Sequence, residues 1–130
     1  MDLIIIGKYK FPVEIALSAE EQSRGLMNCY EPKIMAFPGK KSIKSFWMKN
    51  TPMPLDLIFA CDGAIVDRKK GSPFSLGNIS SDYESDLIVE FPRGVLDHFP
   101  INIGDDICLN YSIKTIAKKF NFTLNKLGDL

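Results

Sequence analysis

Histidine and cysteine, side chains that often bind transition metals, are scarce in this chain. It has a single histidine, His98, and three cysteines, Cys29, Cys61 and Cys108. The cysteines are odd in number and none forms a C-x-x-C pair, whereas a disulfide scaffold needs an even set and a structural zinc site needs paired ligands. The sequence therefore predicts no metal site and no cofactor, and its reduced thiols fit a reducing compartment.

Long hydrophobic runs are also missing. The most apolar stretch near the start, residues 3–6, is far shorter than the ~20 residues that a membrane-spanning helix needs. Asp2 precedes this run and Lys8 follows it, whereas a signal peptide has a basic start and an apolar stretch of ~7–15 residues. We therefore expect a cytoplasmic protein without a membrane segment, in which residues 2–6 form the first β-strand.

An excess of either charge is absent, because 16 Lys and Arg residues balance 16 Asp and Glu residues. Nucleic-acid and anionic-membrane binders derive much of their affinity from surplus positive charge, so this balance disfavours both functions. Four lysines nevertheless surround Phe46 and Trp47 in the sequence, and basic grooves with aromatic rings bind single strands. These are Lys40, Lys41, Lys44 and Lys49. A single-stranded nucleic-acid-binding barrel is therefore an alternative, although a solvated basic loop is favoured.

The 130 residues, 45% of them hydrophobic, suffice for one domain with its own core. Short apolar or alternating segments between turn residues predict β-strands. They lie at residues 2–6, 10–17, 34–37, 45–48, 55–60, 65–67, 87–91 and 107–111. Asp62-Gly63 predicts a tight hairpin turn, Pro38-Gly39 predicts another turn, and residues 69–86 predict a long surface loop. The predicted fold class is mainly β, an antiparallel β-sandwich or barrel of about seven short strands.

Two segments have helical patterns. Ser18 and Glu21 form a capping-box sequence, and Gly25 is the expected end of this short helix. The tail carries apolar residues at the spacing of an amphipathic helix; they are Ile113, Ile116, Ala117 and Phe120. We expect residues 1–111 to form the domain and residues 112–130 to be an extension that packs on it or on a second copy, as in a homo-oligomer.

The densest group of chemically useful side chains lies in residues 46–56. It offers an indole, an ammonium, an amide, a hydroxyl and a carboxylate, on Trp47, Lys49, Asn50, Thr51 and Asp56. Polar groups beside an aromatic plate suit a sugar or another polar ring. Polar residues next to prolines also often hold a loop by hydrogen bonds, and spacing alone favours that structural role.

The chain resembles the DUF192 family (uncharacterised ACR) in four stretches. They read E-Q-S-R-G-L-M at 21–27, W-M-K-N-T-x-x-P-L-D at 47–56, E-F-P-R-G at 90–94 and G-D at 104–105. The resemblance spans about residues 11–111 and implies a compact, mainly β domain, but no reaction, substrate or cofactor. The chain departs from the family at residues 34–37, where I-M-A-F replaces G-M-L-F after a shortened loop, and it lacks the export signal of many relatives.

The resemblance also selects the polar motif residues as a candidate site. They are Arg24, Trp47, Lys49, Asn50, Thr51, Asp56, Glu90 and Asp105. We expect them to gather in one cleft, with Arg24 forked onto Asp56 or Glu90. The favoured function is non-catalytic binding of a small polar or sugar-like ligand around Trp47 and Lys49. The alternatives are a hydrolase or lyase that uses Asp56 and Glu90 as acid and base, and a purely structural role.

Overall fold

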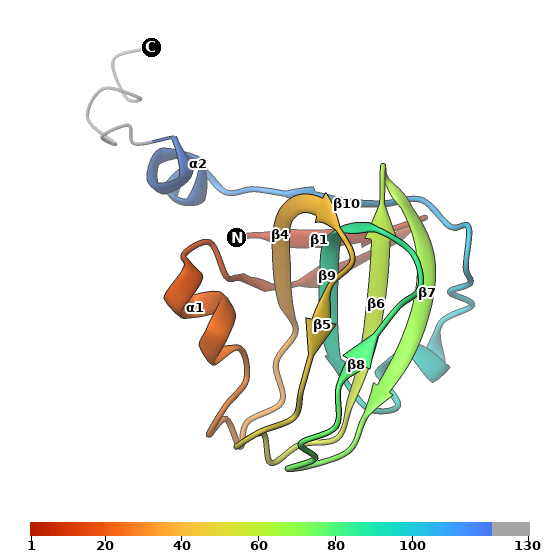
Figure 1. The fold of residues 1–130 in the computed structure, drawn as a ribbon. Coiled ribbons are helices and arrows are strands. Elements are labelled where there is room, and N and C mark those ends of the chain that lie inside the picture. Colours follow the sequence, from red (N-terminus) through yellow and green to blue (C-terminus); the bar gives the residue numbers. More distant parts are fainter. Residues whose placement is uncertain (121–130) are drawn as a thin grey trace.

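Strands dominate residues 1–120, the part of the chain that the computed structural model describes (Figure 1). In chain order the elements are β1 (Leu3–Ile6), β2 (Tyr9–Pro12), β3 (Glu14–Ile15), α1 (Ala19–Arg24), β4 (Met35–Ser42), β5 (Ser45–Phe46), β6 (Leu55–Cys61), β7 (Ala64–Gly71), β8 (Ile79–Ser80), β9 (Ser85–Pro92), the 3-10 turn η1 (Val95–His98), β10 (Ile107–Asn110) and α2 (Ile113–Lys119). The predicted mainly β class is confirmed. The sheets form an open sandwich and do not close into a barrel.

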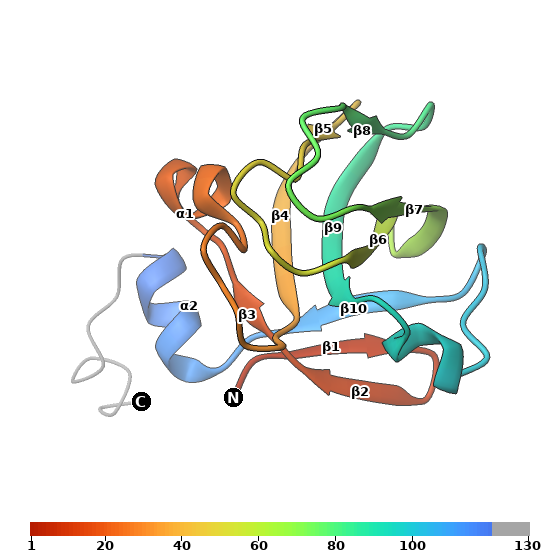
Figure 2. The same cartoon turned by 90° about the horizontal axis from the view of Figure 1, so that it is seen from below.

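A five-stranded sheet with the order β3-β4-β9-β6-β7 is the centre of the fold. A three-stranded sheet, β10-β1-β2, runs across one of its faces, while α1 and the small β5-β8 sheet lie on the other side (Figure 2). The space between the two larger sheets is filled by buried apolar side chains, including Ile4, Phe11, Ile58, Val89 and Phe91. The central sheet is therefore covered on both faces.

Strand β6 shows how the central sheet serves two cores. Leu55, Leu57 and Phe59 pack into a second apolar cluster on the side of α1 and β5, whereas Ile58 and Ala60 pack into the core between the sheets. Successive side chains of a strand point to opposite faces, so this is the alternation that the sequence predicts for residues 55–60. The prediction is confirmed.

The prediction of a single strand over residues 10–17 is wrong. Strand β2 ends at Pro12, and β3 then joins β4 in parallel, in the other sheet. The chain crosses between the sheets at Val13, whose N–H donates to the Asp2 carbonyl over 3.1 Å. Proline has no N–H for a ladder, and β2 is accordingly an edge strand. The alternation is real, but its two halves belong to different sheets.

The prediction of a turn at Pro38-Gly39 is also wrong. Strand β4 continues through both residues to Ser42, and its pairing with β9 shifts register between Pro38 and Ser42. The irregularity accommodates the proline and the glycine without ending the strand. Residues 69–86 likewise contain more structure than a loop, because β7 reaches Gly71 and β8 follows at Ile79–Ser80.

The capping box that starts α1 is confirmed. The Glu21 N–H donates to Ser18 Oγ and the Ser18 N–H donates to Glu21 Oε1, both over 3.0 Å. The helix ends at Arg24, and Gly25 follows with φ 48° and ψ −127°. No residue of α1 is buried, so packing contributes little to the stability of this helix. The hydrogen bonds of the capping box are therefore important for its position beside the second apolar cluster.

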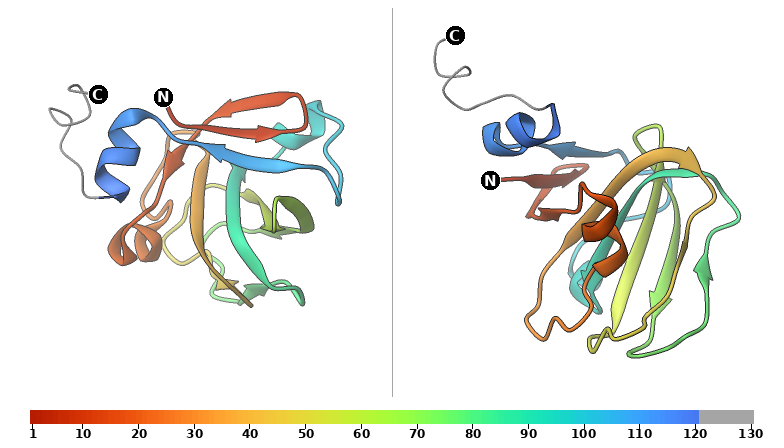
Figure 3. Two further views of the ribbon diagram at one scale, coloured as in Figure 1. Left: turned by 90° about the horizontal axis from the view of Figure 1, so that it is seen from above. Right: turned by 60° about the vertical axis from the view of Figure 1, so that its left-hand side comes forward.

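Helix α2 lies beside the N-terminus of the chain (Figure 3). The Asp2 carboxylate accepts the Ser112 N–H and the Thr115 hydroxyl, both over 2.7 Å. The remainder of the predicted extension, residues 121–130, lies outside the described residues. Within residues 1–120, neither helix has the length and apolar character needed to cross a bilayer.

Candidate functional site

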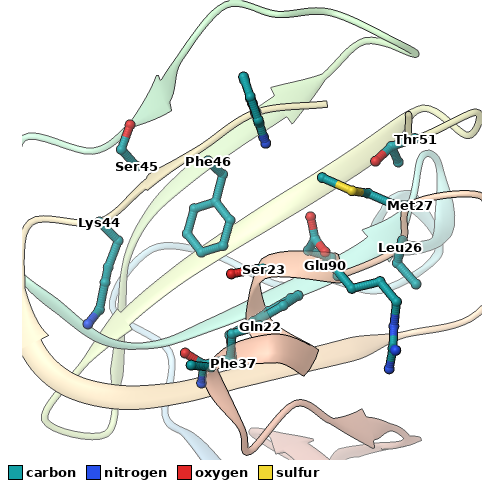
Figure 4. A pocket seen from close by; sticks show the side chains of 14 residues that line it. Gln22, Ser23, Leu26, Met27, Phe37, Lys44, Ser45, Phe46, Thr51 and Glu90 are labelled. Atoms are coloured by element: carbon teal, nitrogen blue, oxygen red, sulfur yellow. The ribbon is translucent and has the colours of Figure 1, made fainter. Parts of the chain in front are cut away.

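A pocket of about 420 Å³ opens between α1, β4, β9 and the segment that follows β5 (Figure 4). Its volume is within the range of small-molecule sites, roughly 300–1,000 Å³. The lining consists of Ala19, Gln22, Ser23, Arg24, Gly25, Leu26, Met27, Phe37, Lys44, Ser45, Phe46, Trp47, Thr51 and Glu90. The pocket therefore joins four stretches of sequence that are far apart in the chain.

Glu90 is the buried charge-bearing residue of this lining. It lies on β9, retains only 6% of its exposure, and its carboxyl group points into the space bounded by Phe46, Ser23 and Met27 in Figure 4. Within residues 1–120, no side chain or backbone group donates a hydrogen bond to it, and its oxygen atoms keep accessible surface on the pocket, whereas Ser85 Oγ is fully buried without a partner. Burial raises the pKa of Glu90 to about 7, because removal from water disfavours the charged form.

Gly25 shapes the pocket wall beside Glu90. A Cβ at this position would lie 3.6 Å from Glu90 Oε1 and 3.5 Å from Phe37 Cζ. The backbone has a φ of 48°, which L side chains rarely adopt, so glycine is the residue that fits this turn. Its missing side chain leaves the carboxyl group accessible from the end of α1.

Aromatic rings form the other walls. Phe46 meets Phe37 edge to face, with ring centroids 5.6 Å apart. Trp47 is 47% exposed, and Lys49 Nζ lies 5.1 Å from the centre of its ring. The segment behind them is held by the buried Met48, whose N–H donates to the Ser75 carbonyl over 3.0 Å. Part of the indole is therefore available to a ligand.

The polar lining residues differ in whether their donors are engaged. Gln22 Nε2 donates to the carbonyls of Ala16 and Pro38 at 3.0 and 2.8 Å, which ties α1 to β4. Lys44 Nζ donates to the Lys40 carbonyl over 2.6 Å. Arg24 is exposed, and while its carbonyl accepts the Met27 N–H over 2.9 Å, its guanidinium makes no hydrogen bond or ion pair with any residue among 1–120. Its guanidinium is thus free to meet a ligand.

Four of the eight predicted site residues line the pocket, namely Arg24, Trp47, Thr51 and Glu90. Lys49 is outside the lining but stacks on Trp47. Asn50 is exposed with φ 56°, and its carbonyl accepts the Asn28 N–H over 2.7 Å, as expected of a turn residue. The structure thus brings half of the predicted group to the pocket, with Lys49 beside Trp47.

Asp56 is not part of this site. It pairs with Phe91 in the β6–β9 ladder while Glu90 pairs with Leu57, so the two carboxyl groups point to opposite faces of the sheet. Asp56 Oδ2 accepts the Gly94 N–H over 3.2 Å, and Oδ1 lies 3.6 Å from Arg93 Nε. The expected acid–base pair is therefore wrong. The expected fork from Arg24 is also wrong, because no ion pair within residues 1–120 joins Arg24 to Asp56 or to Glu90.

Asp105 does not line the pocket either, and its hydrogen bonds join it to a different part of the chain. Its Oδ2 accepts the Asn102 N–H over 2.8 Å, and its carbonyl accepts the Ile65 N–H over 3.0 Å. These bonds close the turn before β10. Asp105 therefore has a structural role in the connection between β7 and β10.

Phe37 and Gln22 line the pocket although neither is among the residues predicted for the site. Phe37 lies in an apolar strand, where hydrophobicity indicates only burial. Gln22 shares the E-Q-S-R-G-L-M stretch with Arg24, and this was the one available signal for it. Residues of an apolar wall cannot be separated from the core without tertiary structure.

A second group of polar side chains, Cys61, Asp62 and Asp86, has potential ligand atoms within 4.8 Å of one another. Lys41 Nζ lies 2.7 Å from Asp62 Oδ2, and Asp86 accepts the Asp62 N–H over 3.1 Å. Both carboxylates are therefore already engaged at an exposed hairpin turn, and we assign no metal to them.

The comparisons with known proteins agree with this architecture. Residues 3–109 match the family DUF192, described as Uncharacterized ACR. The structure of a protein of unknown function from Novosphingobium aromaticivorans is similar with a TM-score of 0.76 and 24% identity, over 84% of each chain. A "putative transcription regulator" from Sinorhizobium meliloti is similar with a TM-score of 0.77 and 25% identity, over 82% of this chain and 92% of its own. No curated protein matches the chain.

Proposed function

Since the chain belongs to the DUF192 family, we propose that its β domain binds a small polar molecule, without chemical conversion, in the pocket between α1, β4 and β9. The shape of the pocket and the chemistry of its lining support this function. It is concave, it has apolar aromatic walls, and a few polar groups converge on it. The ligand enters beside Trp47 and lies against the exposed part of the indole.

The observation that carries the proposal is the Glu90 carboxyl group. Burying a polar group without a hydrogen-bond partner costs about 1–3 kcal/mol. Glu90 is 6% exposed and receives no hydrogen bond from residues 1–120, yet it lies in the wall of a 420 Å³ pocket. A ligand that hydrogen-bonds this group would offset the cost of its burial.

Sugar-like molecules are suitable candidates for the same reason. Their apolar ring faces stack on aromatic side chains, and their hydroxyl groups hydrogen-bond to carboxyl and hydroxyl groups. The pocket offers the Trp47 indole for stacking and the Thr51 hydroxyl and Glu90 carboxyl groups for hydrogen bonding. A polar ring of this kind was the ligand class expected from residues 46–56.

The proposal is tested by screening small polar molecules, monosaccharides included, against the ¹⁵N-labelled protein by NMR. We expect a binder to shift the Gly25 amide and the Trp47 indole N–H signals, which come from two separate stretches of the pocket lining. Trp47→Ala should weaken binding about tenfold, through loss of stacking worth ~1 kcal/mol or more. The matched control is Tyr83→Ala, since Tyr83 is exposed but outside the lining. Binders that shift only signals outside the pocket would contradict the proposal.

Acid–base catalysis by Glu90 alone is a second candidate function. The observation in its favour is a pKa of about 7, which suits a group that both accepts and donates protons at neutral pH. Arg24 lines the same pocket and would stabilise negative charge that develops on a substrate. Mass spectrometry of each bound molecule after incubation tests this function. Conversion that Glu90→Gln abolishes while binding persists would establish it, and unchanged molecules would support simple binding.

A cytoplasmic location and self-association through the C-terminal segment are further proposals. The three free cysteines fit a reducing compartment. Ile113 on α2 and Phe120, which follows the helix, are 66% and 59% exposed, which leaves apolar surface for a second copy. Cell fractionation tests the location. Light scattering of the protein with and without Ile113→Ser tests the association.

A further inference from the structure

Arg24 and Glu90 line the same pocket but do not pair with each other. No ion pair joins them, and neither has a hydrogen-bonding side-chain partner among residues 1–120. The chain does pair such groups elsewhere, since Arg93 Nε lies 3.6 Å from Asp56 Oδ1. The pocket lining thus contains one cationic and one acidic side chain that form no ion pair with each other.

The two charges lie at different depths. Glu90 is 6% exposed on the pocket wall formed by β9, whereas Arg24 is an exposed residue at the end of α1. Gly25 follows Arg24 in the chain and lies beside Glu90 in space, because a Cβ at position 25 would be 3.6 Å from Glu90 Oε1. The carboxyl group of Glu90 therefore lies deeper in the pocket than the exposed residue Arg24.

The surroundings of Glu90 suit an organic cation. Phe37 and Phe46 form the nearby walls, and aromatic faces attract ammonium groups when water is excluded. Lys44 also lines the pocket, but its ammonium group donates to the Lys40 carbonyl. At the rim, the guanidinium of Arg24 has the fork of donors that binds a carboxylate in two hydrogen bonds.

We propose that the ligand is a small zwitterion whose ammonium group binds Glu90 and whose carboxylate binds Arg24. This inference rests on the proposed binding function and narrows it to one charge pattern. A simple anion would meet the Glu90 carboxylate in the interior, and a simple cation would meet Arg24 at the rim. A neutral molecule would form hydrogen bonds with these groups but would bring no opposite charge to either of them. A zwitterion matches both groups in the order in which the pocket presents them.

The test uses ω-amino acids of increasing length: glycine, 4-aminobutanoate and 6-aminohexanoate. Butylamine and butanoate serve as analogues with a single charge, and glucose serves as a neutral probe. Dissociation constants come from NMR titration at pH 8, where the Glu90 carboxyl group is mostly ionised given its pKa of about 7. We expect one amino acid to bind at least about tenfold more tightly than either single-charge analogue, because it gains a second charge-assisted contact.

Two isosteric variants locate the charges. Glu90→Gln should remove the advantage of the amino acid over butanoate, and Arg24→Gln should remove its advantage over butylamine. Lys10→Gln is the control, because Lys10 is an exposed cation on β2, outside the pocket lining. It should leave all dissociation constants within about twofold. Thermal melting of each variant shows whether it is folded. If a variant does not fold, the ligand series on the unmodified protein still compares the zwitterions with the single-charge analogues.

The outcomes separate this inference from the function on which it rests. If glucose or the single-charge analogues shift the pocket signals as strongly as every amino acid, the zwitterion inference is wrong and the binding function stands. If no probe here and no molecule of the wider screen shifts them, both are wrong. An amino acid whose affinity is unchanged by both Glu90→Gln and Arg24→Gln would also overturn the inference.

Discussion

At the scale of single residues, Asp56 and Glu90 show how neighbours decide what a buried carboxyl group does. Both are less than 10% exposed and lie on adjacent strands. Asp56 has Arg93 and the Gly94 N–H as partners, which makes it a support for the turn after β9. Glu90 has no partner among residues 1–120 and faces a pocket. The same side-chain chemistry therefore serves structure in one case and the candidate site in the other.

The raised pKa of Glu90 predicts a pH dependence of stability. The carboxyl group has a pKa of about 7 in the folded protein against 4.5 in the reference state, so the folded protein binds more protons between these values. Its free energy of unfolding should fall by up to ~3 kcal/mol as the pH rises from below 4.5 to above 7. Urea unfolding at several pH values should show this fall relative to Glu90→Gln. The exposed control Glu84→Gln should retain it.

Replacement of Asp56 should cost stability and leave ligand binding unchanged. Asp56→Ala removes the acceptor of the Gly94 N–H and the partner of Arg93, and the expected loss is about 1–3 kcal/mol in the free energy of unfolding. Thermal or urea unfolding measures it. Asp97→Ala, at an exposed residue of η1, is the control and should have little effect. A weaker affinity of folded Asp56→Ala for pocket ligands would contradict the structural role.

At the scale of elements, short segments with special backbone requirements place the site residues. Helix α1 has six residues, and a capping box holds its start while Gly25 turns the chain at its end. The segment after β5 that carries Trp47 is fixed by Met48, which is 1% exposed and lies against Gly71 of β7. The pocket walls thus depend on close packing between elements more than on long helices or strands.

The contact between Met48 and Gly71 gives a prediction for this packing. A Cβ at position 71 would overlap the Met48 side chain, so Gly71→Ala should destabilise the protein by about 1–3 kcal/mol. Met48→Ala alone should cost about 2–5 kcal/mol through the cavity that it leaves. The double variant should be more stable than the sum of the two losses predicts, because the added methyl group then fills freed space. Additive losses in urea unfolding would show that the two residues do not compete for space.

At the scale of the whole molecule, the two ends of the described chain are joined. Strand β1 pairs with β10 along its length, and Asp2 caps the segment that leads into α2. Lys118 on α2 also lies 3.6 Å from Glu21 on α1. Contacts between the first and last described elements therefore hold the two ends of the fold together. These contacts lie near α1, which forms one wall of the pocket.

Removal of the Asp2 carboxylate should loosen α2 selectively. Asp2→Ala deletes two hydrogen bonds, each worth about 0.5–1.5 kcal/mol, to Ser112 and Thr115. Hydrogen exchange of the amides in residues 113–119 should become about fivefold to tenfold faster, while amides of β6 and β9 change little. Lys114→Ala on the same helix is the control. Equal acceleration throughout the central sheet would indicate that the contact stabilises the whole fold.

The sequence by itself determined the local features of this protein. The capping box at Ser18, the alternation of residues 55–60, the Asp62-Gly63 turn and most strand positions follow from interactions between residues that are close in the chain. These features require only local hydrogen bonds and the two-residue period of a strand.

Tertiary structure decided which local features share a sheet and which side chains share a pocket. Pro12 ends a strand in one sheet while Pro38 is tolerated inside a strand of another, since β2 lies at an edge and β4 absorbs its proline in an irregular pairing. The register of β6 against β9 placed Asp56 and Glu90 on opposite faces. A shift of one residue would have reversed those faces, and only the packing of both cores fixes that register.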